Sequence, residues 1–82
     1  MLHVVDVRPT GGYRLWIRFS DDVEGEIDLA DELDGVVFGP LRDPALFAQV
    51  HIDPDVHTVA WPNGADFAPE FLRERVEQRT AA

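Results

Sequence analysis

The sequence predicts an α+β domain, in which an antiparallel sheet (a three-strand meander plus a β-hairpin) is combined with short helices and a C-terminal helix. Two observations support this prediction. Short runs of β-branched and aromatic residues, separated by turn residues, fill the first third of the chain, and an apolar pattern of helical period follows Pro69. The chain has 82 residues, 45% of them hydrophobic, so we expect a single domain over residues 1–82.

The first three elements are predicted to be strands. Residues 2–8 are mainly β-branched and stop at the hairpin-like loop of residues 9–12. Residues 13–19 alternate cleanly, as expected for a strand with one face in the core. A turn leads to a third strand over residues 23–29. In the second strand the core face is assigned to Tyr13, Leu15, Ile17 and Phe19, and the opposite face to Arg14, Trp16 and Arg18.

Short helices and a second hairpin are predicted for the middle of the chain. Residues 28–34 are expected to make one or two helical turns that Gly35 ends, and residues 41–50 to make a second short helix. Residues 51–53 and 57–61 flank a proline turn, which predicts the hairpin.

The segment from Trp61 to Leu72 is the most informative part of the chain. Pro62, Asn63 and Gly64 suit successive positions of a β-turn, so the chain is expected to reverse after Trp61. Pro69 suits the first turn of a helix, and either Asp66 or the backbone near Ala68 is expected to cap the free amide groups there. Asp66 is preferred because Ala68 has no side-chain oxygen, and the alternative role for Asp66 is an exposed catalytic acid. A structural role is therefore assigned to Trp61, Pro62, Asn63, Gly64, Asp66 and Pro69.

Together with the pattern before it, this segment resembles the bacterial family called domain of unknown function 2442. The resemblance covers nearly the whole chain and is most specific in the Trp-Pro-Asn-Gly-Ala-Asp core of residues 61–66. It implies no established activity, and it implies a toxin-antitoxin-like gene pair with another small uncharacterised protein; some longer relatives add a helix-turn-helix DNA-binding part. Two positions depart from the family pattern. Asp22-Val23 stand where relatives usually have a glycine, and Arg73 stands where a tyrosine is common.

The charge of the chain is strongly negative. Sixteen acidic residues face seven arginines, for a net charge of −9, and half of the acidic residues lie between Asp21 and Asp34. Such a field repels phosphate backbones, so we expect no direct nucleic-acid binding unless the arginines gather on one face. A basic protein partner suits the field better, although net charge also serves solubility. The chain has no cysteine, no signal sequence and no long apolar run, so we expect a cytoplasmic protein with no membrane contact.

Several possible chemical sites are weak. Residues 20–31 partly imitate a calcium loop, but the end positions are wrong and a strand precedes them. His51 and His57 flank a turn with two aspartates, which could gather zinc ligands, but the spacing matches no standard pattern. The only serine, Ser20, has no histidine or lysine near it in sequence to activate it. We therefore expect no enzyme activity, no catalytic residue, no metal and no cofactor.

The strand face of Trp16 is the leading candidate for binding. Trp16 lies between Arg14 and Arg18, where a partner could favourably desolvate it, unless a helix of the same domain covers this face. The leading hypothesis is a non-catalytic protein-protein interaction module, the antitoxin-like partner of a small basic protein from an adjacent gene. Its contact surface would combine this face with the acidic rim of residues 21–34.

Two other hypotheses stay open at this point. One is a small-molecule or metal-sensing domain that uses a pocket beside Trp61, Asn63 and Asp66, or the hairpin of His51 and His57. The other is a homodimer formed through an open edge strand.

Overall fold

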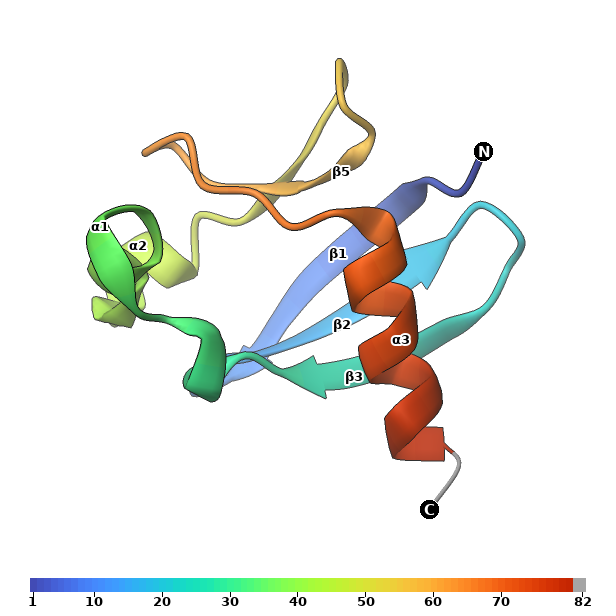
Figure 1. Cartoon of the computed structure of the whole chain (residues 1–82), viewed down its shortest axis with the longest axis horizontal. Coiled ribbons are helices and arrows are strands. Elements are labelled where there is room, and N and C mark those ends of the chain that lie inside the picture. Colours follow the sequence, from blue (N-terminus) through green and yellow to red (C-terminus); the bar gives the residue numbers. More distant parts are fainter. Residues whose placement is uncertain (81–82) are drawn as a thin grey trace.

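The computed structural model describes residues 1–80 and confirms the α+β fold. Strands β1, β2 and β3 form an antiparallel sheet in that order, and β4 pairs with β5 in a separate hairpin (Figure 1). The strands are β1 (Val4–Gly11), β2 (Arg14–Phe19), β3 (Glu24–Asp28), β4 (His51–Asp53) and β5 (Thr58–Ala60). The helices are α1 (Gly35–Phe38), α2 (Pro44–Phe47) and α3 (Pro69–Thr80), with 3-10 turns η1 (Ala30–Glu32) and η2 (Gly39–Arg42).

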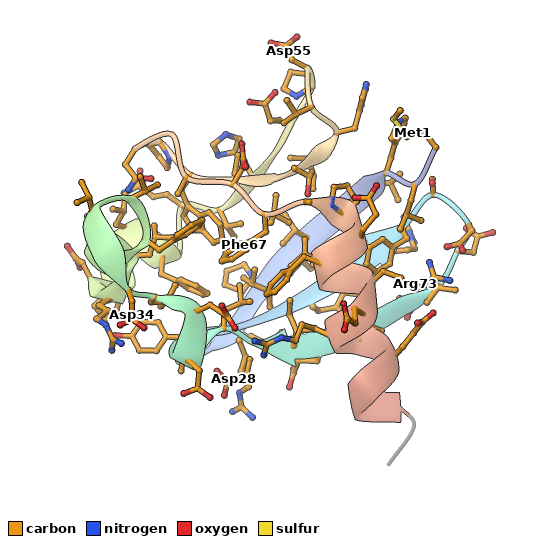
Figure 2. The ribbon with its side chains drawn as sticks, viewed as in Figure 1. Met1, Asp28, Asp34, Asp55, Phe67 and Arg73 are labelled. Carbon is orange, nitrogen blue, oxygen red and sulfur yellow. The ribbon has the colours of Figure 1, made fainter. Side chains whose placement is uncertain are left out.

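The core lies on one face of the three-stranded sheet, which we call the inner face. On β2 the predicted core residues Leu15, Ile17 and Phe19 are fully buried, as expected from the alternation, whereas Tyr13 is only partly buried. Helix α3 crosses this face and contributes Leu72 and Val76 to the same core. Figure 2 shows Phe67 in the interior, with Asp28, Asp34 and Asp55 at the periphery.

Helix α3 approaches β3 closely at one glycine. A methyl group built on Gly25 would lie 2.8 Å from the Val76 Cγ1 atom, closer than real side-chain carbons come. The missing side chain of Gly25 therefore lets the helix pack directly on the edge strand.

The segment after β5 joins the hairpin to the rest of the core. Trp61 is 2% exposed, and its indole N–H donates to the Phe47 carbonyl at 2.9 Å. The turn is closed by the Gly64 amide, which donates to the Trp61 carbonyl at 3.0 Å. Asn63 accepts from the Ala65 amide and donates to the Val37 carbonyl, so the turn also holds α1 in place.

The structure corrects the expected cap of α3. The Leu72 amide donates to the Ala68 carbonyl, which makes Ala68 the cap residue of this helix. Asp66 instead lies in an isolated β-bridge with Ala60, and its exposed carboxylate has no hydrogen bond within residues 1–80. The prediction of an Asp66 cap is therefore wrong, because the backbone is still extended at this residue.

Three element boundaries also differ from the predicted ones. Strand β1 continues through Pro9 to Gly11, where a loop was expected. Gly35 begins α1 with a φ of +87° instead of ending a helical turn. The predicted helix over residues 41–50 is divided into η2 and α2. Asp43 lies between them and caps the start of α2, because its carboxylate accepts a hydrogen bond from the Ala45 amide.

None of the helices within the described residues has the length and apolar character that a bilayer-spanning helix needs.

Candidate functional site

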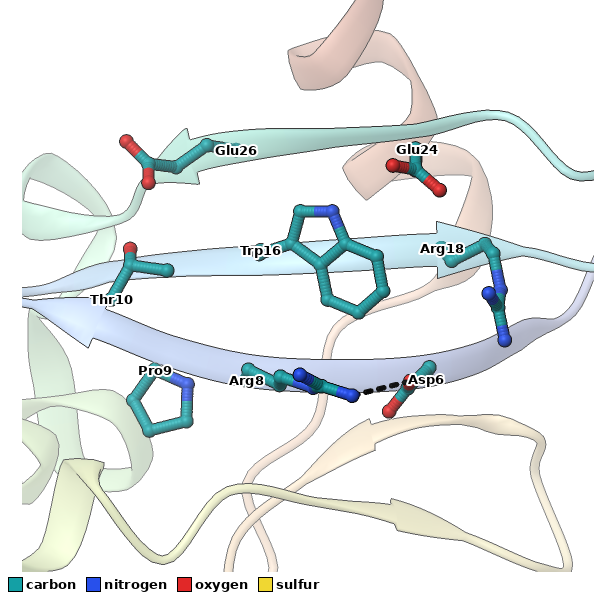
Figure 3. Close-up of a pocket in the computed structure, with 8 residues that line it drawn as sticks. All are labelled: Asp6, Arg8, Pro9, Thr10, Trp16, Arg18, Glu24 and Glu26. Atoms are coloured by element: carbon teal, nitrogen blue, oxygen red, sulfur yellow. Dashed lines mark ion pairs between the residues drawn. The ribbon is translucent and has the colours of Figure 1, made fainter.

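The face of the sheet opposite the core, which we call the outer face, gathers one aromatic ring and seven charged side chains. The strand register places Trp16 opposite Arg8 on β1 and Glu26 on β3. Residues directly opposite each other on neighbouring strands point to the same face, so the alternation of β2 determines which partners lie beside Trp16. The outer face consists of Asp6, Arg8, Arg14, Trp16, Arg18, Glu24, Glu26 and Asp28, and Figure 3 shows all of these except Arg14 and Asp28.

Trp16 lies between two guanidinium groups. The Arg8 Cζ atom is 5.5 Å from the ring centroid and the Arg18 Cζ atom is 6.0 Å from it. These cation–π contacts explain why Trp16 is only partly exposed although no helix lies over it. A large aromatic ring flanked by arginines has the composition that dominates binding energy in protein interfaces.

The ion pairs of the outer face are loose and exposed. The distance from Arg8 Nη2 to Asp6 Oδ2 is 3.9 Å, and the distance from Arg14 Nη1 to Glu26 Oε1 is also 3.9 Å. The Arg8 side chain is 74% exposed. Such pairs contribute between about 0 and 1 kcal/mol to stability. Their charges are therefore easily redirected toward a partner.

No helix within residues 1–80 covers the outer face. In Figure 3 this face is seen from the front, and α3 lies behind the sheet. The alternative that a helix of the same domain hides Trp16 is therefore wrong. An open depression of about 660 Å³ is lined by Trp16 and its neighbours on all three strands.

The sequence indicates Arg14, Trp16 and Arg18, together with the acidic rim, but not Asp6 and Arg8, which β1 adds to this face. Arg8 and Asp6 could have been found by extending the alternation of β2 across the hairpin, but the register has irregularities on both sides of this stretch of β1. Glu24 and Glu26 lie within the acidic rim that was expected to contribute.

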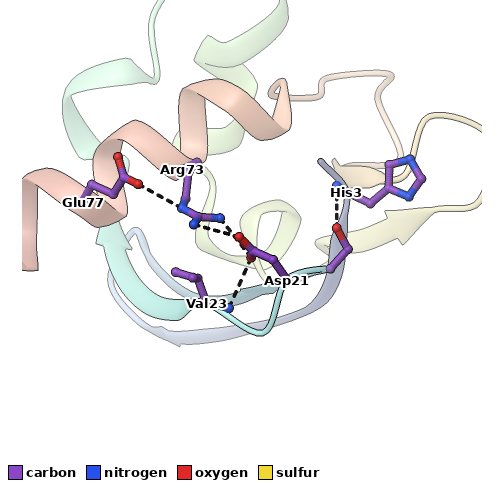
Figure 4. A network of polar contacts seen from close by, with 6 residues as sticks. His3, Asp21, Val23, Arg73 and Glu77 are labelled. Carbon is purple, nitrogen blue, oxygen red and sulfur yellow. Dashed lines mark hydrogen bonds and ion pairs between the residues drawn. The ribbon is translucent and has the colours of Figure 1, made fainter. Parts of the chain in front are cut away.

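A second polar cluster ties α3 to the turn between β2 and β3 (Figure 4). Arg73 donates to Asp21 at 2.8 Å and to Glu77 at 3.2 Å, and Asp21 also accepts from the Val23 amide. The hydrogen bond from Arg73 lowers the pKa of the Asp21 carboxyl, and the same contact raises the pKa of Arg73. This cluster stabilises the position of α3 over the turn between β2 and β3.

Arg73 is more buried than the helical pattern suggested. Its guanidinium lies 5.2 Å from the centroid of the Phe19 ring, and the side chain is 20% exposed. The planar guanidinium of Arg73 therefore covers a core aromatic ring. Arg75 does the same over Phe71, also at 5.2 Å.

The turn between β2 and β3 has a strained residue. Asp22 adopts a φ of +71°, a conformation that glycine enters most easily. An aspartate therefore occupies the left-handed position of this turn.

The proposed metal ligands do not converge. His57 stacks on His3, with 4.3 Å between ring centroids, whereas His51 has its Nδ1 atom 3.2 Å from the Gln49 carbonyl. Asp53 accepts from the amides of Asp55 and Val56 and so shapes the hairpin turn. Among the residues that the structure describes, no three histidine, cysteine or acidic side chains are placed to hold a metal ion.

The other two weak sites are also occupied by structural contacts. The imitation of a calcium loop over residues 20–31 is divided among a turn, strand β3 and η1. Beside α1 the Trp61 and Asn63 side chains are engaged with backbone groups, and Asp66 points away into solvent. The polar groups of Trp61 and Asn63 therefore serve the packing of the turn.

A family model described as "Protein of unknown function (DUF2442)" matches residues 4–78. The chain belongs to this family. No curated protein matches this chain.

The fold is similar to that of a solved structure from Nitrosomonas europaea ATCC 19718, named "putative DNA binding protein NE0471". The TM-score is 0.84 and the sequence identity 24% over 99% of this DUF2442 chain. The chain spans about half, 52%, of the length of that protein. At this identity the likeness shows the fold alone, and the name describes the longer protein.

Proposed function

We propose that this DUF2442 domain is a non-catalytic protein-interaction module that binds a small basic protein through the outer face of its sheet. The observation that supports the proposal is the position of Trp16. This large ring lies in the centre of a face that the fold leaves open, between Arg8 and Arg18. Burial of such a ring by a partner is strongly favourable.

The charge of the domain indicates the kind of partner. The outer face has four carboxylates and three guanidiniums, and the whole chain has a net charge of −9. A basic protein would be attracted by the overall field and would find carboxylates on the face itself. The gene pairing that the family resemblance implies makes the product of the adjacent gene the first partner to test, in an antitoxin-like role.

The test is co-expression of this domain with the product of the adjacent gene, followed by isothermal titration calorimetry of the purified pair. We expect a complex at micromolar concentration or tighter, and a loss of affinity of tenfold or more for Trp16→Ala. Val36→Ala is the matched control, because Val36 is an exposed hydrophobic residue on α1, outside the outer face. Absence of a complex, or equal binding by both variants, would refute the proposal.

Direct nucleic-acid binding is the second candidate. Arg8, Arg14 and Arg18 surround an exposed aromatic ring, an arrangement that can stack a base, and the solved structure of similar fold is named as a DNA-binding protein. The arginines would have to gather on one face to overcome the negative field of the chain, whereas on the outer face carboxylates alternate with them. Retardation of DNA or RNA at 50 mM salt, with a steep loss on adding salt, would favour this candidate over the first.

A further inference from the structure

Strand β3 has an outer edge whose main-chain groups point away from the sheet. The Phe19 amide donates to the Val23 carbonyl, and the Leu29 amide donates to the Tyr13 carbonyl. In an antiparallel pair the hydrogen-bonded positions recur at every second residue, so Gly25 also bonds to β2. The amides and carbonyls that face outward are therefore those of Glu24, Glu26 and Asp28.

This edge is open. No main-chain hydrogen bond joins those outward groups to another residue in the described part of the chain. The opposite edge of the sheet is partly covered, because the Val4 amide donates to the His57 carbonyl of the second hairpin. Helix α3 crosses the inner side of β3 and passes its edge in both views (Figures 1 and 3). A strand added to β3 would therefore extend the sheet with α3 beside its inner side.

The side chains at this edge determine which strand can be added. The three residues with outward main-chain groups are all acidic, and their side chains belong to the outer face. A second copy of this chain, added antiparallel about Glu26, would place Glu24 opposite Asp28 and Glu26 opposite itself. Like charges directly opposite each other destabilise a strand pair, so the edge disfavours self-association.

From this geometry we infer that β3 accepts an extended basic segment of the partner as a fourth, antiparallel strand. Arginine or lysine at every second position would lie beside Glu24, Glu26 and Asp28 on the outer face. Residues between them would face the side of α3. Main-chain hydrogen bonds would supply affinity and the alternating charges would supply register. The inference rests on the proposed function and specifies the partner segment that it needs.

The first experiment uses three synthetic peptides with the sequence Thr-Arg-Val-Arg-Val-Arg-Thr, acetylated and amidated at the ends. One is unmodified, one is N-methylated at the three arginines, and one is N-methylated at the two valines. In the antiparallel arrangement the arginine amides donate to β3 and the valine amides point away. Calorimetric titration should show binding of the unmodified peptide, a tenfold or greater loss for the arginine-methylated peptide and a smaller change for the valine-methylated one.

The three peptides have the same charge, so the pattern of methylation separates strand addition from simple electrostatic attraction. Equal binding by all three peptides, or an equal loss for both methylated peptides, would overturn the inference. A loss for the valine-methylated peptide alone would overturn the antiparallel arrangement.

The second experiment changes the protein. Glu26→Pro removes an N–H that points outward and leaves every hydrogen bond between β3 and β2 in place. Edge strands tolerate a proline at such a position. If the thermal melt of Glu26→Pro shows no cooperative unfolding transition, this variant is not folded. Glu26→Arg then replaces it, because reversal of the charge leaves the main chain intact. Asp55→Arg on the other hairpin is the control for charge. We expect a tenfold or greater loss of peptide affinity for either Glu26 variant and little change for the control.

The same variants separate this inference from the proposed function. Trp16→Ala tests the outer face. Glu26→Pro tests the edge by comparison with Glu26→Ala, which loses the same outer-face carboxylate but keeps the outward N–H; all variants are tested with the product of the adjacent gene as partner. Loss of the complex for Trp16→Ala with full binding by Glu26→Pro would overturn strand addition and leave the outer-face proposal standing. Full binding by both variants would refute both.

Discussion

The inner and outer faces of the three-stranded sheet differ in what each one needs from the rest of the chain. On β2 alone, Leu15, Ile17 and Phe19 are fully buried, while Trp16 and Arg18 between them remain partly exposed. The inner face is complete because α3 and the short helices pack on it. The outer face contributes little to folding, and its aromatic centre is available for binding.

The comparison is tested most directly by two neighbouring residues on β2. Ile17→Ala removes a fully buried side chain and should lower the free energy of unfolding by about 3 kcal/mol. Trp16→Ala removes a larger side chain from the outer face and should cost about 1 kcal/mol or less. Urea denaturation followed by circular dichroism measures both. An equal or greater loss for Trp16→Ala would mean that the outer face is part of the core.

The next largest effect is expected where α3 meets β3 on the inner face. Gly25→Ala places a methyl group 2.8 Å from Val76, so we expect a loss of about 2 kcal/mol from overpacking. Gly39→Ala is the control, because a methyl group there would meet no atom within 4 Å. Denaturation of the two variants in parallel measures the difference. A stable Gly25→Ala variant would show that α3 can lift from the sheet without loss.

A smaller effect, and one that depends on pH, is expected at the ion pair that holds α3 over the inner face. Arg73 lowers the pKa of Asp21 in the folded state, so the pair stabilises the fold above the pKa of the unfolded chain, near 3.8. This contribution is lost as the pH falls through the lower, folded pKa. Asp21→Asn should therefore lower the melting temperature at pH 7, and the difference from the parent should shrink below pH 4.

Removal of one carboxylate also reduces the repulsion within a chain of net charge −9, so the Asp21 experiment needs a control. Asp55→Asn removes a carboxylate from the tip of the second hairpin, where no ion pair is formed with residues 1–80. A pH profile of Asp21→Asn that matches the profile of Asp55→Asn would contradict a specific role of the Arg73 contact.

The smallest effect is expected in the turn that joins β2 to β3, which belongs to neither face. Asp22→Gly should raise the free energy of unfolding by up to about 1 kcal/mol, because the native φ of +71° is strained for any residue with a side chain. Asp22→Ala should lower it, since the strain remains and the polar side chain is lost. Thermal melts of both variants measure the sign. Partner binding through the outer face should be unchanged in both.

The sequence predicted the faces of β2 well because alternation is a local signal that the packing did not override. It could not decide whether the outer face is covered, because that depends on where the helices dock and on how short they are. Helix α3 and the four-residue helices α1 and α2 leave this face uncovered within residues 1–80. The openness of the Trp16 site is therefore a property of tertiary packing.

The positions of Pro9, Gly35 and the α3 arginines differ from the local sequence pattern for physical reasons. Pro9 was expected in a loop because it lacks an N–H, but in the observed register it lies opposite Leu15, at a position that does not bond to β2. Gly35 was expected to end a helical turn, but it begins α1. The hydrogen bond from Asn63 to the Val37 carbonyl, which holds α1, joins residues far apart in the sequence and cannot be inferred from the local pattern. The helical pattern after Pro69 also does not show that Arg73 and Arg75 stack on Phe19 and Phe71.

The placement of the two tryptophans makes the domain its own optical reporter. Trp61 is enclosed at 2% exposure, whereas Trp16 remains in partial contact with water. In a Trp61→Phe variant the indole of Trp16 would be the single long-wavelength emitter. A blue shift of its fluorescence would then signal docking at the sheet without any attached dye, while emission from Trp61 in the complementary Trp16→Phe variant would follow unfolding.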